Sequence, residues 1–215
     1  NGDHAHKYRL VYFDLKGRGE PIRLLFRYFD VSFIDYRVGG EEWATLKAES
    51  TMEQLPILEI DDGKKTLSDS MAITRYLAKV FSSGFLGRSR TAAAAVDMHM
   101  SQYNDLFFYY AFLARAKGEH EKEKATEQFE RSATRFLRCH EKIISANQSH
   151  LVLVGSELTL ADLYVFYMLW ILDDMECALF SRENQPVLMQ FYEKMRELPS
   201  IAVYISEQWP SKILA

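Results

Sequence analysis

Tyr12 is the residue with the clearest chemical potential, because it ends an apolar segment, residues 8–13, and directly precedes a turn rich in glycine and charge. A tyrosine hydroxyl at the end of a strand can donate a hydrogen bond to an anion above the sheet edge. If the anion is a thiolate, the bond lowers the pKa of the thiol, and each pKa unit corresponds to about 1.4 kcal/mol. Arg18, in the turn, could stabilise the same charge. Taken separately, Tyr12 could simply fill a strand face, and Arg18 could be a solvated turn residue.

Leu55-Pro56 opens a segment that is predicted to be a strand. Proline cannot donate a hydrogen bond to a neighbouring strand, so we expect a cis peptide bond that turns the backbone of Leu55 outward. A peptide ligand could then pair with Leu55 as an added strand. The alternative is an ordinary trans proline, because only about 5–6% of X–Pro bonds in folded proteins are cis.

Asp69 and Ser70 come directly before a helical pattern. The free amides and the hydroxyl at such a helix start suit a carboxylate, and the Asp69 carboxylate suits an ammonium group. Trp43 and Lys47, one helical turn apart, could close over a second carboxylate. A plain helix cap and an exposed helix face are the simpler interpretations. Together, however, these features describe a ligand with one thiol, two carboxylates and an α-ammonium group, and that ligand is glutathione.

The elements that must position these residues alternate between strands and helices in the first third of the chain. Segments rich in Tyr, Val and Phe predict strands, and Pro21 suits the first turn of a helix. The order βαβαββα predicts a thioredoxin-like domain over residues 7–81, with a mixed four-stranded sheet covered by helices. The predicted strands are 8–13, 31–38, 55–60 and 66–68, and the predicted helices are 20–29, 41–48 and 70–80.

Small and turn-forming residues predict a linker at 82–90, and the patterns after it are helical. Residues 91–215 are therefore predicted to form an all-helical domain. Thr159 and Asp162 have the spacing of a capping box, and the nearly all-apolar helix that follows should lie at the centre. The predicted helices are 91–116, 121–145, 160–172, 186–197 and 201–207.

Composition excludes several classes of function. The 215 residues carry 26 Lys and Arg against 30 Asp and Glu, so there is no basic surplus for a phosphate backbone and we expect no nucleic-acid partner. The longest apolar run, residues 163–172, is shorter than the ~20 residues that span a bilayer, so we expect no membrane span. Cys139 and Cys177 are the two cysteines and lack metal-type spacing, which favours a reducing, cytoplasmic compartment.

Residues 8–23, 54–61 and 68–77 together resemble the cytosolic glutathione transferases. The tyrosine followed by Phe-x-x-x-Gly-Arg-Gly-Glu is similar to the sigma class, which includes invertebrate detoxification enzymes and the glutathione-dependent prostaglandin D synthases. Leu158-Thr-Leu-Ala-Asp162 resembles the helix-capping box of the family, so the resemblance covers essentially the whole chain.

The resemblance implies a set of site residues. Tyr12 would activate the thiol, and Arg18 would support it. Asp105 would reach the glutamyl ammonium group of the neighbouring subunit's ligand, which implies a homodimer. The implied glutathione contacts are Trp43, Lys47 and Gln54 for the glycyl end, Leu55 beside cis-Pro56 for backbone pairing, and Asp69 and Ser70 for the γ-glutamyl end. The implied electrophile pocket consists of Phe13, Leu15, Tyr109, Phe112 and Leu214.

The chain departs from the family pattern at three places. Thr51-Met52-Glu53 replaces the usual Pro-Phe-Gly beside the glutathione site, which bears on affinity or loop geometry. Phe112 stands where the prostaglandin synthases have tryptophan, so that isomerase activity is not supported. Ser101 and Asn104 accompany Asp105 where those synthases have a metal-linked aspartate cluster, so we expect no activating metal.

Two functions remain open at this point. In the first, glutathione is deprotonated and attacks a hydrophobic electrophile by substitution or addition, and peroxidase or isomerase activity would use the same thiolate. In the second, the chain is a catalytically weak relative, as the lens S-crystallins are, or a carrier of apolar ligands. The site residues that the chain retains favour the enzyme; they are Tyr12, Arg18, Trp43, Asp69 and Ser70.

Overall fold

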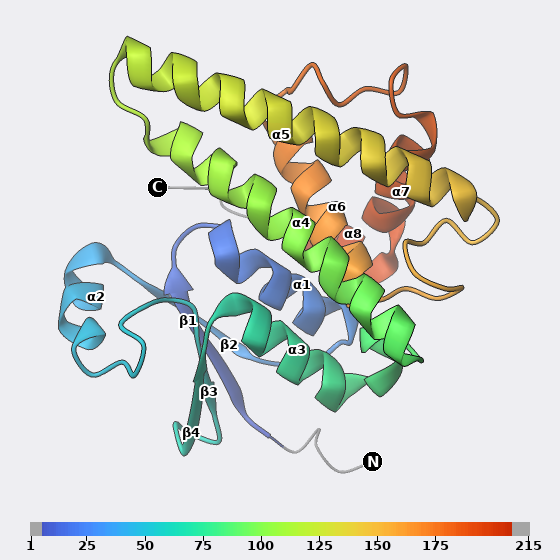
Figure 1. Cartoon of the computed structure of the whole chain (residues 1–215). Coiled ribbons are helices and arrows are strands. Elements are labelled where there is room, and N and C mark those ends of the chain that lie inside the picture. Colours follow the sequence, from blue (N-terminus) through green and yellow to red (C-terminus); the bar gives the residue numbers. More distant parts are fainter. Residues whose placement is uncertain (1–5, 208–215) are drawn as a thin grey trace. The chain divides into compact units, whose positions relative to one another are not determined.

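The computed structural model describes residues 6–207 (Figure 1). The described chain divides into two compact units. One is formed by residues 6–83 together with 198–207, and the other by Gly84–Glu197. Each unit is described by itself below.

A mixed four-stranded sheet forms the centre of the first unit, as the sequence predicted. The strand order is β2-β1-β3-β4, where β1 (Tyr8–Phe13) runs parallel to β2 (Ile34–Val38). Strand β3 (Ile57–Ile60) is antiparallel to both β1 and β4 (Lys65–Ser68). The strands are short and rich in β-branched and aromatic residues, which pack well on a half-buried pleated surface.

Two helices cover one face of this sheet (Figure 1). Helix α1 (Glu20–Tyr28) and helix α3 (Ser70–Phe81) pack against each other, and each buries apolar residues, among them Leu25 of α1 and Leu77 of α3. Helix α2 (Gly40–Lys47) differs, since none of its residues is buried. A short 3-10 turn, η2 (Gly17–Gly19), connects β1 to α1 and lies beside the candidate site.

Helix α8 (Pro199–Ser206) packs on α1 and therefore lies in the first unit. This differs from the prediction that all of residues 91–215 form the second domain. The physical reason is that α8 buries Ile201 and Tyr204, three residues apart on one helix face, and Tyr204 hydrogen-bonds to Glu20 of α1. A helical pattern predicts such a face but does not say which domain covers it.

The second unit is a bundle of four α-helices, and these agree with the predicted ones to within about two residues at each end. Helix α6 is buried on every side from residue 160 to 172, as expected for the centre of a helical domain. Although α6 is so apolar, no helix within residues 6–207 has both the length and the hydropathy needed to cross a membrane. The four helices are α4 (Arg90–Arg115), α5 (Glu119–Ala146), α6 (Leu160–Asp174) and α7 (Pro186–Glu197).

The segment predicted as a linker is partly ordered as a 3-10 turn, η3 (Ser83–Leu86). Phe85 of this turn is buried. The predicted capping box of α6 is present, because the Thr159 side chain accepts from the Asp162 backbone and the Asp162 side chain accepts from the Thr159 backbone. The start of the helical unit's central element is thus fixed by local sequence.

Candidate functional site

The register of the sheet brings the predicted site segments to one end of the first unit. Val11 pairs with Ile57, and Ile57 pairs with Ser68. Tyr12 follows Val11, Pro56 precedes Ile57, and Asp69 follows Ser68. Segments that are up to 57 positions apart in the chain therefore meet at the same end of the sheet, which is called the Tyr12 edge below.

The peptide bond between Leu55 and Pro56 is cis, as predicted. Pro56 is buried and Leu55 is half-buried, while Gln54 before them is exposed. The loop that leads into this bond contains Glu53 with a positive φ of 49°. This conformation is uncommon for a residue with a Cβ atom, and it lies in the loop where the sequence departs from the family pattern.

The Tyr12 ring is buried at the end of β1, and its hydroxyl oxygen accepts a hydrogen bond of 2.9 Å from the backbone N–H of Arg18. The sequence suggested that the Arg18 side chain would support the charge, whereas the structure shows its backbone at Tyr12. A donor on the phenolic oxygen fixes the orientation of the hydroxyl and polarises it, since hydrogen bonds in a chain strengthen one another. A polarised hydroxyl is the better donor to an anion.

Two glycines make room for the Tyr12 ring. A Cβ atom at Gly19 would lie 2.6 Å from Cδ1 of Tyr12, and one at Gly17 would lie 2.6 Å from its hydroxyl oxygen and 2.5 Å from Cδ1 of Leu15. Gly17 also has a positive φ of 43°, which glycine adopts without steric cost. The glycine-rich turn is therefore shaped around Tyr12, and Leu15 lies in the same turn.

Asp69 is the N-cap of α3, a role that is compatible with both interpretations of this residue. Its Oδ1 accepts hydrogen bonds from the N–H groups of Met71 and Ala72, at 3.0 and 2.9 Å. Its backbone has φ 77° and ψ 120°, a strained conformation of the kind that often occurs at ligand sites. Ser70, the first residue of the helix, is buried.

Trp43 is connected to Tyr12 by Phe13. The Phe13 and Trp43 rings lie edge to face with centroids 6.3 Å apart, and the Tyr12 and Phe13 centroids are 5.9 Å apart. Lys47 and Gln54 are exposed, and their side chains form no hydrogen bond or ion pair with another described residue. The structure thus brings Phe13, Trp43 and Tyr12 together at the sheet edge.

The remaining predicted residues lie in the second unit or outside the description. Asp105 is exposed on α4, and the same helix carries Tyr109 and Phe112, both half-buried. Leu214 lies outside the described residues. Of the predicted electrophile pocket, Phe13 and Leu15 belong to the first unit.

The sequence analysis missed a buried charged cluster below the Tyr12 turn. Arg23 of α1 is fully buried, and its Nε donates to both oxygens of Asp35, at 3.0 and 3.1 Å. Its Nη1 lies 3.3 Å from Oε2 of Glu20 and 3.0 Å from the carbonyl oxygen of Leu15. A Glu and an Arg three residues apart in α1, each beside apolar residues, were the available signal.

Burial and charge act in opposite directions in this cluster. Burial raises the pKa of Glu20, and the Arg23 guanidinium and the Tyr204 hydroxyl oppose this rise. Burial acts to lower the pKa of Arg23, but the carboxylates of Glu20 and Asp35 outweigh it, so that its pKa is raised. The guanidinium therefore remains charged, with a carboxylate on each side.

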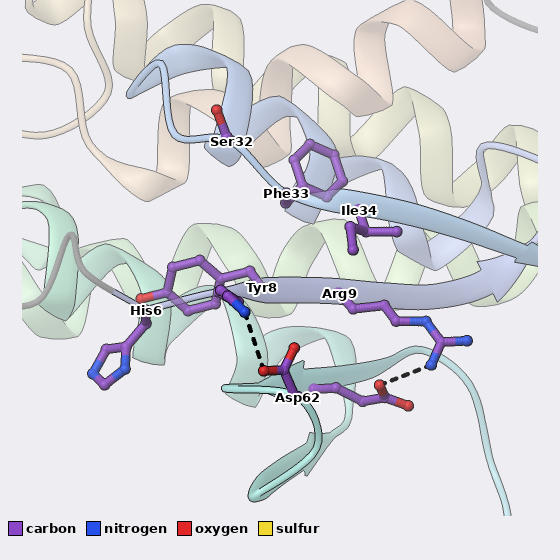
Figure 2. Close-up of a pocket in the computed structure, with 9 residues that line it drawn as sticks. His6, Tyr8, Arg9, Ser32, Phe33, Ile34 and Asp62 are labelled. Atoms are coloured by element: carbon purple, nitrogen blue, oxygen red, sulfur yellow. Dashed lines mark hydrogen bonds and ion pairs between the residues drawn. The ribbon is translucent and has the colours of Figure 1, made fainter.

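A cavity of about 530 Å³ lies at the opposite end of the sheet, where β1 begins (Figure 2). The charged groups around it are already paired: Lys7 with Asp62 at 3.2 Å, and Arg9 with Glu59 at 3.0 Å. None of the predicted site residues lines it. Size alone therefore does not identify the functional site, and the Tyr12 end of the sheet remains the better candidate.

No group of three or more His, Cys, Asp or Glu side chains in the described part of the chain is arranged to hold a metal ion. The absence of an activating metal remains a prediction from the sequence. The chemistry available at the Tyr12 edge is that of hydrogen-bond donors, a helix N-terminus and an exposed lysine.

Two family models match the chain. Residues 9–79 match the model described as "Glutathione S-transferase, N-terminal domain", and residues 104–208 match the one described as "Glutathione S-transferase, C-terminal domain". The first match includes the whole Tyr12 edge of the sheet, and the second begins within α4.

Individual relatives are similar over nearly the whole chain. Glutathione S-transferase 4 of Caenorhabditis elegans is 34% identical over 204 residues, which cover 93% of this chain and 95% of the relative. S-crystallin SL11 of Nototodarus sloanii is 31% identical over 209 residues, with coverages of 94% and 96%. The crystal structure of monomeric Na-GST-3, from the hookworm Necator americanus, has a TM-score of 0.82 at 31% identity and covers 94% of this chain and 97% of that one.

Proposed function

The chain belongs to the glutathione S-transferase family, and we propose that it binds glutathione, activates the thiol through the Tyr12 hydroxyl and directs the thiolate at hydrophobic electrophiles. The observation that carries the proposal is the position of Tyr12. Its hydroxyl is held by the Arg18 N–H at the sheet edge where the cis-Pro56 and Asp69 segments also end. Glutathione transferases use glutathione as co-substrate, and the motif around Tyr12 supports the sigma class.

Glutathione would lie along the edge of the sheet. The backbone of Leu55 would pair with the tripeptide as a short added strand, because Leu55 lies just before β3 and outside the pairs that β3 forms with β1 and β4. Asp69, whose Oδ1 already caps α3, would bind the γ-glutamyl ammonium group, and Ser70 with the helix N-terminus would bind its carboxylate. Trp43, Lys47 and Gln54 would bind the glycyl end.

Activation needs a modest pKa shift. A thiol with a pKa near ~8.5 is mostly protonated at neutral pH, and lowering the pKa by about two units makes the thiolate the major form. The Tyr12 hydroxyl would donate a hydrogen bond to the sulfur, which favours the ionised form. The thiolate then forms a bond to the electrophilic carbon, and the leaving group departs or the adjacent double bond takes up the electron pair.

The electrophile pocket would combine aromatic and aliphatic side chains. Phe13 and Leu15 from the first unit, with Tyr109, Phe112 and Leu214, are the proposed residues. Discrimination among apolar substrates in such pockets amounts to about 1–3 kcal/mol per methylene, so a broad range of hydrophobic electrophiles is expected.

We also propose that the protein forms a homodimer in which Asp105 reaches the glutathione of the partner. The support is the exposed character of the α4 face, where Asp105 lies near exposed Met98 and Phe108. A polar groove of about 570 Å³ between α4 and α5 adds three arginines that form no ion pair with another described residue: Arg131, Arg135 and Arg138. A partner subunit that supplies acidic groups would neutralise them.

Cys139 and Cys177 are free thiols. This state supports a reducing compartment, and we propose the cytoplasm as the location, with a detoxification role that follows from the electrophile chemistry.

The test is turnover of a generic aryl halide with glutathione by the wild type and Tyr12→Phe. We expect kcat/KM to fall about 10²-fold in the variant, because a positioned proton donor contributes on that order. Tyr8→Phe, which changes the buried tyrosine at the other end of β1, is the matched control and should leave kcat/KM within about twofold. Equal rates for the wild type and Tyr12→Phe would remove the role given to Tyr12.

A second candidate function is a non-catalytic relative that acts as a crystallin or as a carrier of apolar ligands. Two observations favour it: the similarity to S-crystallin SL11, and the exposed Met52 in the loop that departs from the family pattern. Glutathione binding by calorimetry with no turnover of any electrophile in a panel would support this candidate and contradict the enzyme.

A further inference from the structure

We propose that helix α8 helps to orient the hydroxyl of the catalytic tyrosine. The Tyr204 hydroxyl acts through Glu20 and Arg23 on the turn whose N–H group holds the Tyr12 hydroxyl. Tyr204 would thus be a positioning residue for the thiolate, although it is 192 residues from Tyr12 in the chain. The inference rests on the proposed function, because it assumes that Tyr12 activates the thiol.

The first contact joins α8 to α1. The Tyr204 hydroxyl donates to Oε1 of Glu20 at 3.1 Å, and both side chains are buried. Burial and the nearby Glu20 carboxylate raise the pKa of Tyr204 well above its ordinary value, so its hydroxyl keeps its proton and remains a donor. The guanidinium of Arg27 lies over the Tyr204 ring at 5.3 Å, a contact that does not need the hydroxyl.

The second contact joins Glu20 to Arg23. Oε2 of Glu20 accepts from Nη1 of Arg23 at 3.3 Å, while Asp35 holds Nε from the other side. Two carboxylates therefore fix the plane of the guanidinium. If the Tyr204 hydroxyl is removed, Oε1 of Glu20 loses a buried donor, and this loss favours a movement of the carboxylate or the guanidinium.

The third set of contacts joins Arg23 to the turn. Nη1 also donates to the carbonyl oxygens of Leu15 and Lys16, at 3.0 and 3.4 Å. The chain then passes through Gly17 to Arg18, whose N–H donates to the Tyr12 hydroxyl at 2.9 Å. A shift of the guanidinium therefore moves the turn that carries this N–H.

Arg23 also lies close to the tyrosine itself. Its Cζ is 5.7 Å from the centroid of the Tyr12 ring, and a Cβ atom at Gly19 would touch both the ring and Nη1. The ring and the guanidinium thus both pack close to Gly19. A misplacement of about 1 Å in a catalytic group can reduce a rate about 10²-fold, so small movements here have kinetic consequences.

The experiment compares Tyr204→Phe with Tyr192→Phe. Both variants remove a tyrosine hydroxyl that donates to a carboxylate, since Tyr192 donates to Asp173 at 2.7 Å in the second unit. The readouts are the pKa of bound glutathione, from the ultraviolet absorbance of the thiolate against pH, together with kcat, the glutathione KM and the melting temperature.

We expect Tyr204→Phe to raise the pKa of the bound thiol by about half a unit, which lowers the thiolate fraction below that pKa about threefold. The value of kcat at neutral pH should fall about three- to tenfold, while the glutathione KM changes less than twofold, because the proposed contacts to the tripeptide lie elsewhere. Tyr192→Phe should lower the melting temperature to a similar extent and leave the thiol pKa unchanged.

An unchanged thiol pKa and kcat in Tyr204→Phe would overturn the inference, and so would an equal shift in Tyr192→Phe. If Tyr204→Phe does not fold, Glu20→Gln interrupts the same connection and must show the same rise in the thiol pKa. A wild type that binds glutathione only as the thiol would overturn the proposed function and this inference together. A wild type with a lowered thiol pKa beside an unaltered Tyr204→Phe overturns the inference alone.

Discussion

At the scale of single residues, the position of Tyr12 depends on two glycines that lack a side chain. Gly17 and Gly19 leave the space that the ring and hydroxyl occupy, and Arg18 between them contributes its backbone N–H. Two glycines, an N–H group and a buried guanidinium thus surround the phenol of Tyr12. The side chain that the sequence made most prominent in the turn, that of Arg18, is not the group that contacts Tyr12 in this hydrogen bond.

Gly19→Ala should therefore reduce both activity and stability, although it adds only one methyl group. The new methyl group would lie 2.6 Å from the Tyr12 ring and 3.2 Å from Nη1 of Arg23, and overpacking of this kind costs about 1–3 kcal/mol. We expect kcat/KM to fall at least tenfold, with a lower melting temperature. Gly40→Ala is the control, because a Cβ atom there meets nothing within 4 Å and a helix gains stability from alanine. Full activity in Gly19→Ala would contradict the account of the turn.

Asp162 is a second residue whose importance comes from several contacts at once. It accepts from the N–H groups of Leu153 and Thr159, at 2.9 and 2.7 Å, and from the Thr159 hydroxyl. Asp162→Ala should destabilise the protein by about 2–4 kcal/mol, since it removes a cap and leaves a buried N–H unpaired. Ser89→Ala, at the exposed N-cap of α4, should cost about 1 kcal/mol. Urea unfolding of both variants at pH 7 measures the difference, and equal losses would contradict it.

At the scale of elements, helices α4 and α5 meet through a buried histidine pair. His140 Nδ1 lies 2.8 Å from the carbonyl oxygen of Phe136 and must donate to it, so His140 Nε2 accepts from His99 Nδ1 at 3.1 Å. This arrangement requires the His140 ring to be neutral. Burial lowers the pKa of His99 to about 4, and burial together with the neighbouring His99 lowers the pKa of His140 to about 3.

The pair predicts that stability falls in mild acid. Below the unfolded-state pKa of about 6.5 the unfolded chain binds protons that the folded chain does not, and each histidine then contributes about 1.4 kcal/mol of loss per pH unit. Burial raises the pKa of Asp162 to about 6, and this acts in the opposite direction because the folded chain takes up that proton first. The net loss of unfolding free energy between pH 7 and pH 5 should be about 2–3 kcal/mol.

Urea unfolding at the two pH values tests this prediction. Replacement of both histidines by leucine should abolish or reverse the loss of unfolding free energy, because leucine binds no proton in the folded or the unfolded chain. His120→Gln, at an exposed position on α5, should leave the pH dependence as in the wild type. A loss that persists in the double variant would show that other groups cause it.

At the scale of the whole molecule, the proposed dimer predicts a mass of twice the 25.0 kDa chain in light scattering. Arg135→Glu should shift the protein towards the monomer, because it reverses charge in the α4–α5 groove, whereas Lys122→Glu near the start of α5 should not. Asp105→Ala should raise the glutathione KM severalfold with little change in kcat. A wild type of 25 kDa, like the relative described as monomeric, would contradict the proposal.

The sequence by itself determined the elements of this protein and the family they build. Hydrophobic periodicity predicted the sheet and the helices, and the proline, glycine and capping residues predicted the cis bond and the start of α6, because these features depend on neighbours within a few residues. The sequence also grouped Tyr12, Pro56 and Asp69 as parts of one site, and the register of the sheet places them at one end of it.

Only the tertiary structure decided which groups surround Tyr12. Glu20 and Tyr204 are separated by 184 positions, and α8 packs on α1 rather than in the helical unit. No local pattern distinguishes a charged residue that faces solvent from one that is buried against a distant helix, because burial depends on what folds back over it. The environment of Tyr12 is a property of that packing, whereas the tyrosine itself is visible in the chain.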